Sequence, residues 1–543
     1  VTALPAPGFV FAGWSDASGT VLGTNHNLTF TMQPRMVLTA TFVDIQAPQL
    51  RFAEPLANAR LTNGYVNLRG TATDNARITN VWVSVNTSWF QPARSTNGWT
   101  NWFLTQQRLA PGTNVLRAYA HDDSGRSSGF ATNKVFLSVK SPLTLQTLGK
   151  GSIRRAFIGN LLEIGRSYSA RAIPATGYVF SNWVGSVTSP NASLSFLMQS
   201  NMTLQANFIP NPFKTAKGRY YGLFSAGARA HDRSGAFSLS LTKGGSYSGS
   251  ARIGTTYYRF AGKLDVAGNA TYTVPRPGTN SLTIKLNVNL TPGIDQLTGS
   301  VSDGMWTASL LAHRAVFSAI SNPARAYAGK YTVIVPGAVS TTLPRGNGFG
   351  AVSITTSGSV RLKGYLADDS PITQSSYISR DGLWPLYVPL YAGKGSICGW
   401  MSFDTNQPPD DLHGVISWIK PAVAGAKYYP SGFTRSVTAE GSRFYPAAYP
   451  GQLLSISNGV VRIEGGELAA PFSTGVALGK TGIPSTNGLT LKLITTDGTF
   501  SGKFVMPDKS RTNILRGALF QNLNCGYGYL LGTNKTGEVF LSP

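Results

Sequence analysis

Apolar and polar residues alternate with a period of two along most of this chain, and helical periodicity never extends beyond a few residues. In the segment 194–208, apolar residues occupy every second position on both sides of the polar dipeptide Ser200-Asn201. A period of two is typical of half-buried strands, and Ser-Asn favours the turn between them. The pattern therefore predicts an all-β protein.

The segments 5–42 and 174–208 repeat one pattern, which marks an array of small modules. Pro5, Gly8, Val10, Phe11, Trp14, Phe30, Met32, Met36 and Phe42 correspond to Pro174, Gly177, Val179, Phe180, Trp183, Phe196, Met198, Met202 and Phe208. We expect each Trp to fill the core of its module, with stacking on a ligand as the alternative.

Both segments carry the motif G-[FY]-x-F-x-x-W, followed by two strand-like runs that end in Phe. This motif resembles the bacterial internalin B-repeat family. The resemblance implies a β-grasp-like or sandwich module, a secreted or cell-surface setting, and a structural or adhesive role rather than catalysis. We assign residues 1–43 and 142–210 to such modules. The strand-like run of the second copy begins near Leu143, well before Pro174, whereas only four residues precede Pro5. We therefore expect the first module to lack its opening strands and the chain to derive from a longer precursor.

Residues 44–141 contain short alternating strands separated by turn signals at the spacing of a β-sandwich. The succession resembles bacterial immunoglobulin-like domains, which implies a spacer or adhesion unit. The matching residues are Val66, Leu68, Gly70, Val83, Val85, Asn86, Trp99, Gly112, Asn114, Ala118, Asp122 and Gly125.

Pro210-Asn211-Pro212 reads as a linker, after which alternating strands are joined by Gly-containing turns. Short connections favour an antiparallel meander, and recurring phrases divide it into units 211–323, 324–430 and 431–543. Barrels would remove the exposed sheet edges, and sandwiches stay open as the alternative. The phrases WPLYVPLY and GYGYLLGTNKTG resemble a glycine-rich C-terminal β-module of large secreted proteins from environmental bacteria, a resemblance that implies a location but no biochemistry.

The 543 residues fit four to six domains of about 100 residues. No apolar run approaches the ~20 residues that span a bilayer, so no membrane-spanning segment is predicted. Lys and Arg number 47 against 23 Asp and Glu, a net charge of +24 that favours anionic partners such as surface polysaccharide. The basic residues are scattered, which speaks against a dedicated nucleic-acid binder.

Residues that carry chemistry are sparse. The five histidines stand apart, and H-x-x-x-H, C-x-x-C and G-x-S-x-G are absent, so we predict no catalytic residue, cofactor or metal ligand. A hydrolase or lyase in the C-terminal half is the weaker alternative. The adjacent pairs Asp122-Asp123, Asp368-Asp369 and Asp410-Asp411 point to opposite faces on a strand, which excludes joint catalysis. In loops they could help to hold Ca2+, but no Asp-x-Asp-x-Asp-Gly loop occurs, and solvated turn aspartates are expected.

The two cysteines, Cys398 and Cys525, are too few for a disulfide-dense scaffold or a multi-cysteine metal cluster. Two interpretations stay open: one disulfide between them in an oxidising compartment, or two buried thiols.

Aromatic clusters offer a candidate glycan-stacking platform on a sheet face, although alternating aromatics more often pack in a core. The candidate residues are Trp99, Trp102, Trp384, Tyr387 and Tyr391. Taken together, the sequence predicts a non-enzymatic, extracellular or cell-surface structural or adhesive protein, with self-association into a fibre or layer as an extension. The alternative is a carbohydrate-binding C-terminal appendage of a larger secreted enzyme.

Overall fold

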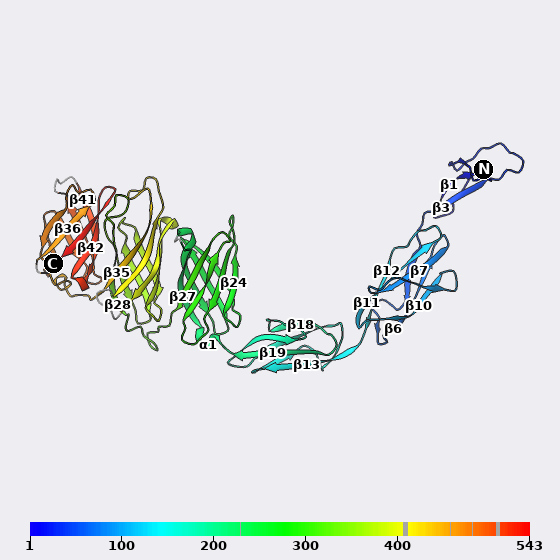
Figure 1. Cartoon of the computed structure of the whole chain (residues 1–543), viewed down its shortest axis with the longest axis horizontal. Helices are drawn as coiled ribbons and strands as arrows, with labels where there is room; N and C mark the ends of the chain where they lie inside the picture. The colour runs from blue at the N-terminus through cyan, green and yellow to red at the C-terminus, as the bar shows by residue number, and fades with distance from the viewer. Residues whose placement is uncertain (228–229, 405–410, 457, 481, 507–510) are drawn as a thin grey trace. The chain divides into compact units, whose positions relative to one another are not determined.

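The computed structural model describes residues 1–227, 230–404, 411–456, 458–480, 482–506 and 511–543, in two compact units, Val1–Pro210 and Asn211–Pro543 (Figure 1). Sheets with mainly antiparallel pairing form nearly all of the regular secondary structure of both units, which confirms the predicted all-β fold. The helical elements are α1 (Phe213–Ala216), η1 (His231–Arg233), η2 (Tyr391–Gly393), η3 (Pro450–Gln452) and η4 (Gln521–Leu523). Among the described residues, no helix has the length and apolar character needed to cross a membrane.

Residues 9–44 form a sheet of three strands: β1 (Phe9–Ser15), β2 (Val21–Gly23) and β3 (Thr39–Asp44). The strand order is β2-β1-β3, and both pairs are antiparallel. Trp14 is buried beside Phe11, with ring centroids 5.5 Å apart. Several apolar residues of this module, including Phe30 and Met32, remain exposed.

The next domain is a two-sheet sandwich. Its strands are β4 (Gln49–Glu54), β5 (Arg60–Leu61), β6 (Tyr65–Thr73), β7 (Ile78–Val85), β8 (Gln91–Pro92), β9 (Arg94–Ser95), β10 (Asn101–Arg108), β11 (Gly112–Asp122) and β12 (Ala131–Leu137). One sheet has the order β4-β6-β10-β9 and the other β5-β12-β11-β7-β8. Leu68 and Trp102 from the first sheet pack in one core with Val83 and Leu116 from the second. Alternate side chains of β11 point into this core, which is the period-two pattern of its sequence.

The second repeat module consists of β13 (Lys140–Leu148), β14 (Gly151–Arg155), β15 (Leu161–Glu163), β16 (Ser167–Pro174), β17 (Tyr178–Gly185), β18 (Ser193–Leu197) and β19 (Met202–Pro210). Its sheets have the orders β15-β13-β19-β17 and β14-β16-β18. The first and last strands pair in parallel, from Leu143 with Met202 to Leu148 with Asn207. Trp183 is fully buried in the core between the sheets, as predicted.

The second unit contains three eight-stranded antiparallel sheets. The first comprises β20 (Gly218–Ser225), β21 (Ser234–Leu241), β22 (Ser246–Ile253), β23 (Thr256–Lys263), β24 (Asn269–Val274), β25 (Leu282–Val288), β26 (Gln296–Ser302) and β27 (Thr307–Arg314). The second comprises β28 (Gly329–Val335), β29 (Gly348–Ile354), β30 (Ser359–Tyr365), β31 (Pro371–Tyr377), β32 (Leu383–Leu390), β33 (Gly395–Phe403), β34 (Leu412–Lys420) and β35 (Phe433–Phe444). The third comprises β36 (Gly459–Gly465), β37 (Phe472–Val476), β38 (Ile483–Thr486), β39 (Leu489–Leu493), β40 (Thr499–Val505), β41 (Thr512–Phe520), β42 (Cys525–Leu531) and β43 (Thr536–Ser542).

Each of these sheets is a meander whose first and last strands also pair, as β20 does with β27, β28 with β35 and β36 with β43. This pairing curls each sheet into a barrel-like form (Figure 1). β35 lies in the second sheet although its residues fall in the range expected for the third module. We therefore propose that the boundary between these modules follows Phe444 rather than residue 430.

Consecutive barrels of the second unit pack against each other. The Tyr387 hydroxyl accepts a hydrogen bond from the Gly254 amide of the first barrel (2.7 Å). The Tyr529 hydroxyl of the third barrel donates to Asp369 of the second (2.6 Å). Buried residues of the second and third barrels, Leu386 and Phe520 among them, belong to one apolar cluster. Residues on the outer face of a strand are thereby buried as well as those on the inner face.

Candidate metal centre

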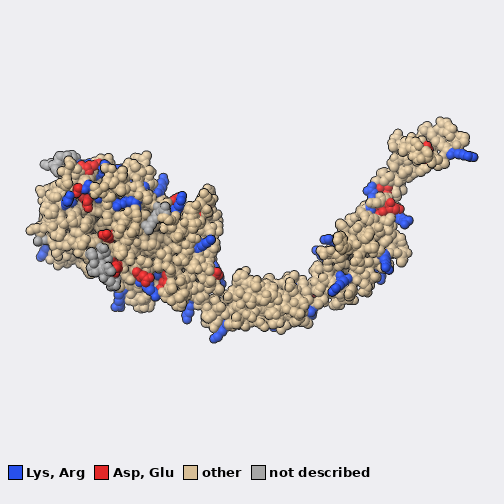
Figure 2. All heavy atoms as spheres, in the orientation of Figure 1, with Lys and Arg blue, Asp and Glu red and all other residues tan. Residues whose placement is uncertain are grey.

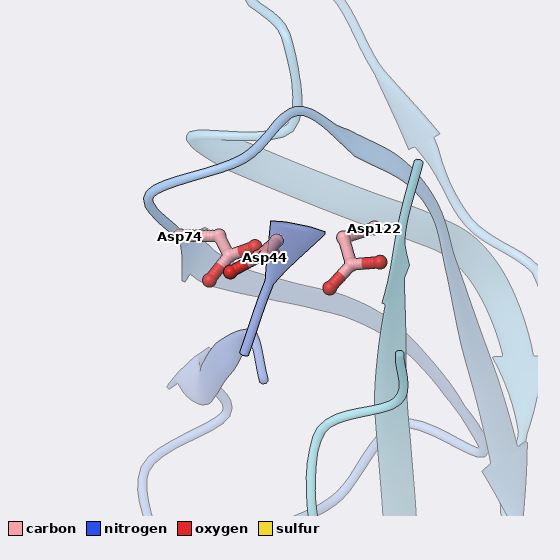
Figure 3. Close-up of side chains that lie close together, drawn as sticks. All are labelled: Asp44, Asp74 and Asp122. Atoms are coloured by element: carbon pink, nitrogen blue, oxygen red, sulfur yellow. The ribbon is translucent and has the colours of Figure 1, made fainter. Parts of the chain in front are cut away.

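Three aspartates from separate parts of the first unit meet where the first repeat module joins the sandwich (Figure 3). Asp44 ends β3, Asp74 lies in the turn between β6 and β7, and Asp122 ends β11. One carboxylate oxygen of each lies within 4.8 Å of the others. The register of the sandwich explains the meeting, because Asp122 pairs with Ile78 and so lies beside the turn that carries Asp74.

Hydrogen bonds hold one oxygen of Asp44 and one of Asp122. Asp44 Oδ1 accepts from Asn75 Nδ2 (2.7 Å) and from the Gln46 amide (3.0 Å). Asp122 Oδ1 accepts from the Arg126 amide (2.8 Å), and Arg126 Nε donates to the main-chain oxygen of Asp44 (2.8 Å). These bonds fix two of the three carboxylates in place.

The remaining oxygens of the cluster are enclosed without a hydrogen bond. Asp44 is 2% exposed and Asp122 is 3% exposed. The enclosed atoms that accept no hydrogen bond from any described residue are Asp44 Oδ2, Asp74 Oδ1, Asp74 Oδ2, Asn75 Oδ1 and Asp122 Oδ2. Buried acceptors are normally satisfied, and leaving a buried polar group unpaired costs about 1–3 kcal/mol. The cluster therefore has unused capacity for a positively charged partner.

The surroundings of Asp44 and Asp74 shift the pKa values of these two carboxylates in opposite directions. The hydrogen bond from Asn75 is the main cause that lowers the pKa of Asp44 below its usual value, and Arg126 acts in the same direction. Burial raises the pKa of Asp74, with repulsion from Asp44 and Asp122 adding to it and the nearby backbone amides opposing it. A cation beside Asp74 would offset the cost of burying its charge.

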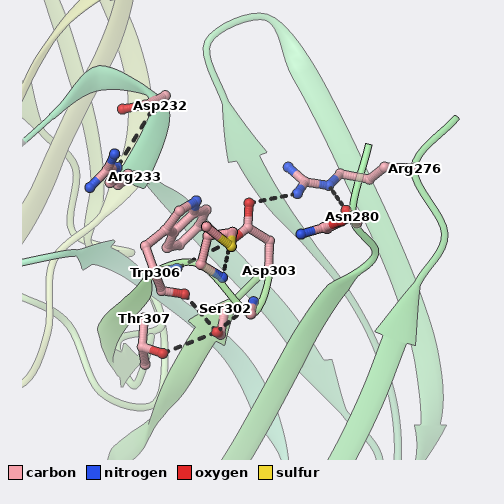
Figure 4. Close-up of polar contacts among 10 residues, drawn as sticks. Asp232, Arg233, Arg276, Asn280, Ser302, Asp303, Trp306 and Thr307 are labelled. Carbon is pink, nitrogen blue, oxygen red and sulfur yellow. Dashed lines mark hydrogen bonds and ion pairs between the residues drawn. The ribbon is translucent and has the colours of Figure 1, made fainter. Parts of the chain in front are cut away.

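An acid in the first barrel shows how carboxylates elsewhere in the chain are satisfied (Figure 4). Asp303 Oδ2 accepts from Arg276 Nη2 (3.0 Å), and its Oδ1 accepts from the Met305 amide (3.0 Å). Arg276 Nε in turn donates to the main-chain oxygen of Asn280 (2.6 Å). This acid ties two neighbouring hairpins and has a cationic partner, which Asp74 lacks among the described residues.

The chemistry of the donor set indicates a hard cation. The cluster offers carboxylate oxygens and an amide oxygen, and it contains no His or Cys. Oxygen donors suit Ca2+ and Mg2+, whereas Zn2+ prefers nitrogen and sulfur. The arrangement can hold one divalent cation.

Sequence reasoning reached only part of this cluster. Asp122 belongs to an adjacent aspartate pair that we expected to be solvated. Asp122 is buried, which corrects that expectation, whereas its neighbour Asp123 is exposed as expected. Asp44 and Asp74 were missed because each is a single acid in its own segment. Asp44 lies in a strand end and Asp74 precedes Asn75, so neither forms a local ligand motif.

The other two aspartate pairs have different environments. Asp368 is buried and forms an ion pair with Lys420 (2.7 Å), while Asp369 accepts the Tyr529 hydrogen bond described above. Neither is a solvated turn aspartate, which corrects that expectation for this pair. Asp411 accepts a hydrogen bond from the Arg443 amide (2.6 Å), and Asp410 lies outside the described residues.

The predicted glycan-stacking aromatics lie largely inside cores. Trp102 and Trp384 are buried, and so is Tyr387 against the preceding barrel. Trp99 packs partly buried on the sandwich core. Tyr391 is partly buried, and its hydroxyl donates to Asp368 (2.7 Å). The platform prediction is corrected for Trp102, Trp384 and Tyr387, because rings enclosed by protein on both faces cannot stack on a sugar.

The two cysteines lie in strands of successive barrels, and a short 3-10 turn precedes each of these strands. Cys398 lies in β33 and packs with Leu223 of the first barrel. Cys525 begins β42 and packs in the cluster shared by the second and third barrels. Both cysteines are buried, and they lie in different apolar clusters.

Comparison with family models places known modules on the first unit. Residues 1–46 and 141–212 match the model described as a divergent InlB B-repeat domain. Residues 48–118 match the model of a bacterial Ig domain. The predicted arrangement of two B-repeat modules flanking an Ig-like domain is therefore confirmed. No curated protein matches the chain.

Among solved structures, the chain is similar to the fibronectin(III)-like modules of Clostridium thermocellum CbhA, with 13% identity over 30% of this chain and 94% of that one (TM-score 0.15). It is also similar to a tetra-tandem repeat in the extending region of a large adhesion protein, with 10% identity over 91% and 97% (TM-score 0.15). A third is the S-layer protein rSbsC(31–844), with 10% identity over 91% and 63% (TM-score 0.12). At these TM-scores the similarities support no inference about the fold or the function of this chain.

Proposed function

We propose that this protein is a secreted or cell-surface structural protein, with adhesive contacts, built to present serial β-modules rather than to catalyse a reaction. The observation that carries this proposal is the B-repeat, Ig-like, B-repeat succession matched by family models. Such modules are spacers and contact units in extracellular proteins, as the resemblance noted in the sequence implies.

The packing supports the view that the modules fold independently. The sandwich and the second repeat each have an apolar core of their own. The third barrel likewise has its own cluster in addition to the one that it shares. A domain that encloses its own core folds without its neighbours, which is what a serial scaffold requires.

The surface charge supports anionic partners and contacts spread over a wide area. Figure 2 shows Lys and Arg scattered over the visible face of both units, without one concentrated patch. Together with the net charge of +24, this favours diffuse attraction to an anionic surface polysaccharide.

Two measurements test the proposal. Immunogold labelling of intact producing cells, with an antibody against this chain, should label the cell surface or the surrounding matrix. Label confined to the cell interior contradicts the proposal. Sedimentation velocity of the chain at increasing concentration should show assemblies larger than the monomer, and a monomer at every concentration would remove self-association from it.

We propose carbohydrate binding by the Ig-like sandwich as a second candidate function, on the basis of an aromatic patch that the sequence analysis missed. Phe90 and Phe130 stack with ring centroids 5.7 Å apart, and Tyr119 meets both edge to face. Trp89 beside them is 92% exposed. Exposed aromatic faces are suited to contact with sugar rings.

Retention on insoluble polysaccharides tests this second function. The double variant Trp89→Ala/Phe130→Ala should lose retention by tenfold or more. Tyr65→Ala is the matched control, because Tyr65 is an exposed aromatic on the other sheet of the same domain. Equal retention of both variants, or none by the unchanged chain, would reject it.

A further inference from the structure

We infer that Asp44, Asp74 and Asp122 bind one Ca2+, which fastens the first repeat module to the Ig-like sandwich. This inference goes beyond the proposed function and does not depend on it, because it follows from the geometry of the cluster alone. An acidic cluster by itself is no evidence of a site, and three further observations point to a cation here.

The first is distance. Ca2+–oxygen bonds are roughly 2.3–2.6 Å long, so two oxygens on opposite sides of one ion lie about 4.8 Å apart. One oxygen of each aspartate already lies within 4.8 Å of the other two. The three side chains therefore need little movement to reach a common ion, and Figure 3 shows the carboxylates directed toward one another.

The second is the state of the enclosed oxygens. Asp44 Oδ2 and Asp122 Oδ2 belong to side chains that are more than nine-tenths buried, and neither accepts a hydrogen bond from the described residues. Each belongs to a carboxylate of the cluster whose other oxygen accepts hydrogen bonds, from Asn75 and Gln46 in Asp44 and from Arg126 in Asp122. The hydrogen bonds thus orient each carboxylate and leave its second oxygen available to a ligand.

The third is charge. None of the ion pairs between described residues includes a carboxylate of this cluster. The Arg126 side chain lies beside Asp44, but its guanidinium donates to the main-chain oxygen of Asp44 rather than to the carboxylate. Three enclosed carboxylates with a single guanidinium beside one of them repel one another, and a divalent ion reduces that repulsion.

Ca2+ fits this donor set better than other common ions. Ca2+ takes six to eight oxygens in a flexible arrangement, which mono- or bidentate carboxylates, the Asn75 amide oxygen and water can supply. Mg2+ demands near-ideal octahedral geometry and keeps most of its water. Zn2+ is disfavoured because His and Cys are absent from the cluster.

The position of the site gives the ion a structural role. Asp44 is the last residue of the first module's final strand, and Asp74 and Asp122 lie at one end of the sandwich. An ion held by all three closes the junction over the short linker 45–48. Binding should therefore restrict motion between the two modules and leave their cores unchanged.

Calorimetric titration of the metal-stripped full chain with CaCl2 tests the inference. We expect saturable Ca2+ binding that falls by tenfold or more in Asp74→Asn and in Asp44→Asn. Asp123→Asn is the matched control, since it removes an exposed carboxylate next to Asp122 and should bind as the unchanged chain does. Titration with MgCl2 at the same concentrations should give binding at least tenfold weaker.

Hydrogen exchange separates a fold defect from a lost ligand. Without Ca2+, Asp74→Asn should exchange as slowly as the unchanged chain, because it relieves repulsion and keeps the side-chain shape. With Ca2+, peptides covering 44–48, 74–77 and 122–126 should slow in the unchanged chain only. The inference is overturned if the unchanged chain binds no Ca2+, or if Asp74→Asn binds and is protected as well as Asp123→Asn.

Discussion

The two B-repeat copies both bury the signature Trp, but they bury the corresponding residues that follow it to very different extents. Met32 is 73% exposed, whereas the corresponding Met198 is fully buried. Their local geometry nevertheless agrees. The pairing of β1 with β3 shifts register between Phe11 and Gly13, and that of β17 with β19 shifts at the corresponding position. In each copy the Trp Nε1 donates to a main-chain oxygen of the following loop.

The difference shows that the shared residues specify an antiparallel strand pair and only half of a core. In the second copy β19 lies between β13 and β17, and the sheet of β14, β16 and β18 covers it. In the first copy β3 pairs with β1 alone among the described strands. Identical residues therefore contribute stability only where other strands cover them.

Truncating the signature Trp should give the largest contrast between the copies. Trp183→Ala removes a fully buried side chain and should lower the free energy of unfolding of its module by ~3–5 kcal/mol. Trp14→Ala should cost less than half as much, because fewer strands enclose it. Hydrogen exchange of peptides from 140–210 and 1–44 measures both, and equal losses would contradict the comparison.

The methionine pair should give the next largest contrast. Met198→Ala should destabilise the second module by ~2–4 kcal/mol, because it leaves a cavity in a closed core. Met32→Ala should change stability by no more than about 0.5 kcal/mol, as surface substitutions usually do. Denaturant unfolding followed by hydrogen exchange reports each value, and a large loss in Met32→Ala would indicate that its module is covered in solution.

Supplying the covering strands should sharpen the comparison. In a chain with a copy of residues 140–173 placed directly before Pro5, the added strands should pair with β3 and cover Phe30 and Met32. We expect a net gain of about 1–2 kcal/mol, since burial of these side chains is largely offset by ordering the added residues. Slower exchange in 39–44 and weaker binding of a hydrophobic dye would show it, and unchanged exchange would refute it.

The junctions of the two copies should respond differently to acid. Glu163 of the second copy forms an ion pair with Arg60 of the sandwich and accepts from Ser138 Oγ (2.7 Å). The bond from Arg60 is the main cause that lowers the pKa of Glu163 from 4.5 to about 2. Because the folded-state pKa is the lower one, this stabilisation is complete above pH 4.5 and is lost as the pH falls toward 2.

Glu163→Gln should therefore cost ~1 kcal/mol at pH 7, a small value because Arg60 is half exposed and screened by solvent. It should cost much less near pH 2, where about half of the Glu163 carboxyls are protonated in the folded state. Unfolding of the chain at a series of pH values measures this, with Glu54→Gln, an exposed acid of the sandwich, as the control. An equal loss at both pH values would assign the effect to packing.

Local patterns sufficed to predict the modules. The B-repeat signature spans only seven residues, and period-two alternation with Gly turns predicted the antiparallel meanders, because both are set by neighbouring residues. Alternation does not reveal what lies on the second face of a strand. β32 is buried on nearly every residue, since it lines its own barrel and also packs against β20. Trp384 and Tyr387, which the sequence offered as candidates for a surface platform, are therefore buried.

The candidate metal centre was out of reach for a related reason. The three acids lie far apart in the sequence: Asp44 ends the last strand of one module, and Asp74 and Asp122 lie in a turn and at a strand end of the next domain. Whether they meet depends on how β3 is placed relative to the sandwich. Of the three, only Asp122 belongs to a sequence pattern that we considered for Ca2+ binding. A search for single acids at strand ends and turns on one side of a predicted sandwich would have found all three.

The direction in which the first and last strands of a module pair has a mechanical consequence. When the two ends of the second repeat are pulled apart, the parallel pair β13 and β19 is loaded in shear, so all its hydrogen bonds must break together. In the first barrel, β20 begins where β27 ends, with Tyr220 opposite Arg314, and the same pull unzips the hydrogen bonds one at a time. Under tension the repeat is the rigid link, and the barrels are the part that yields and extends.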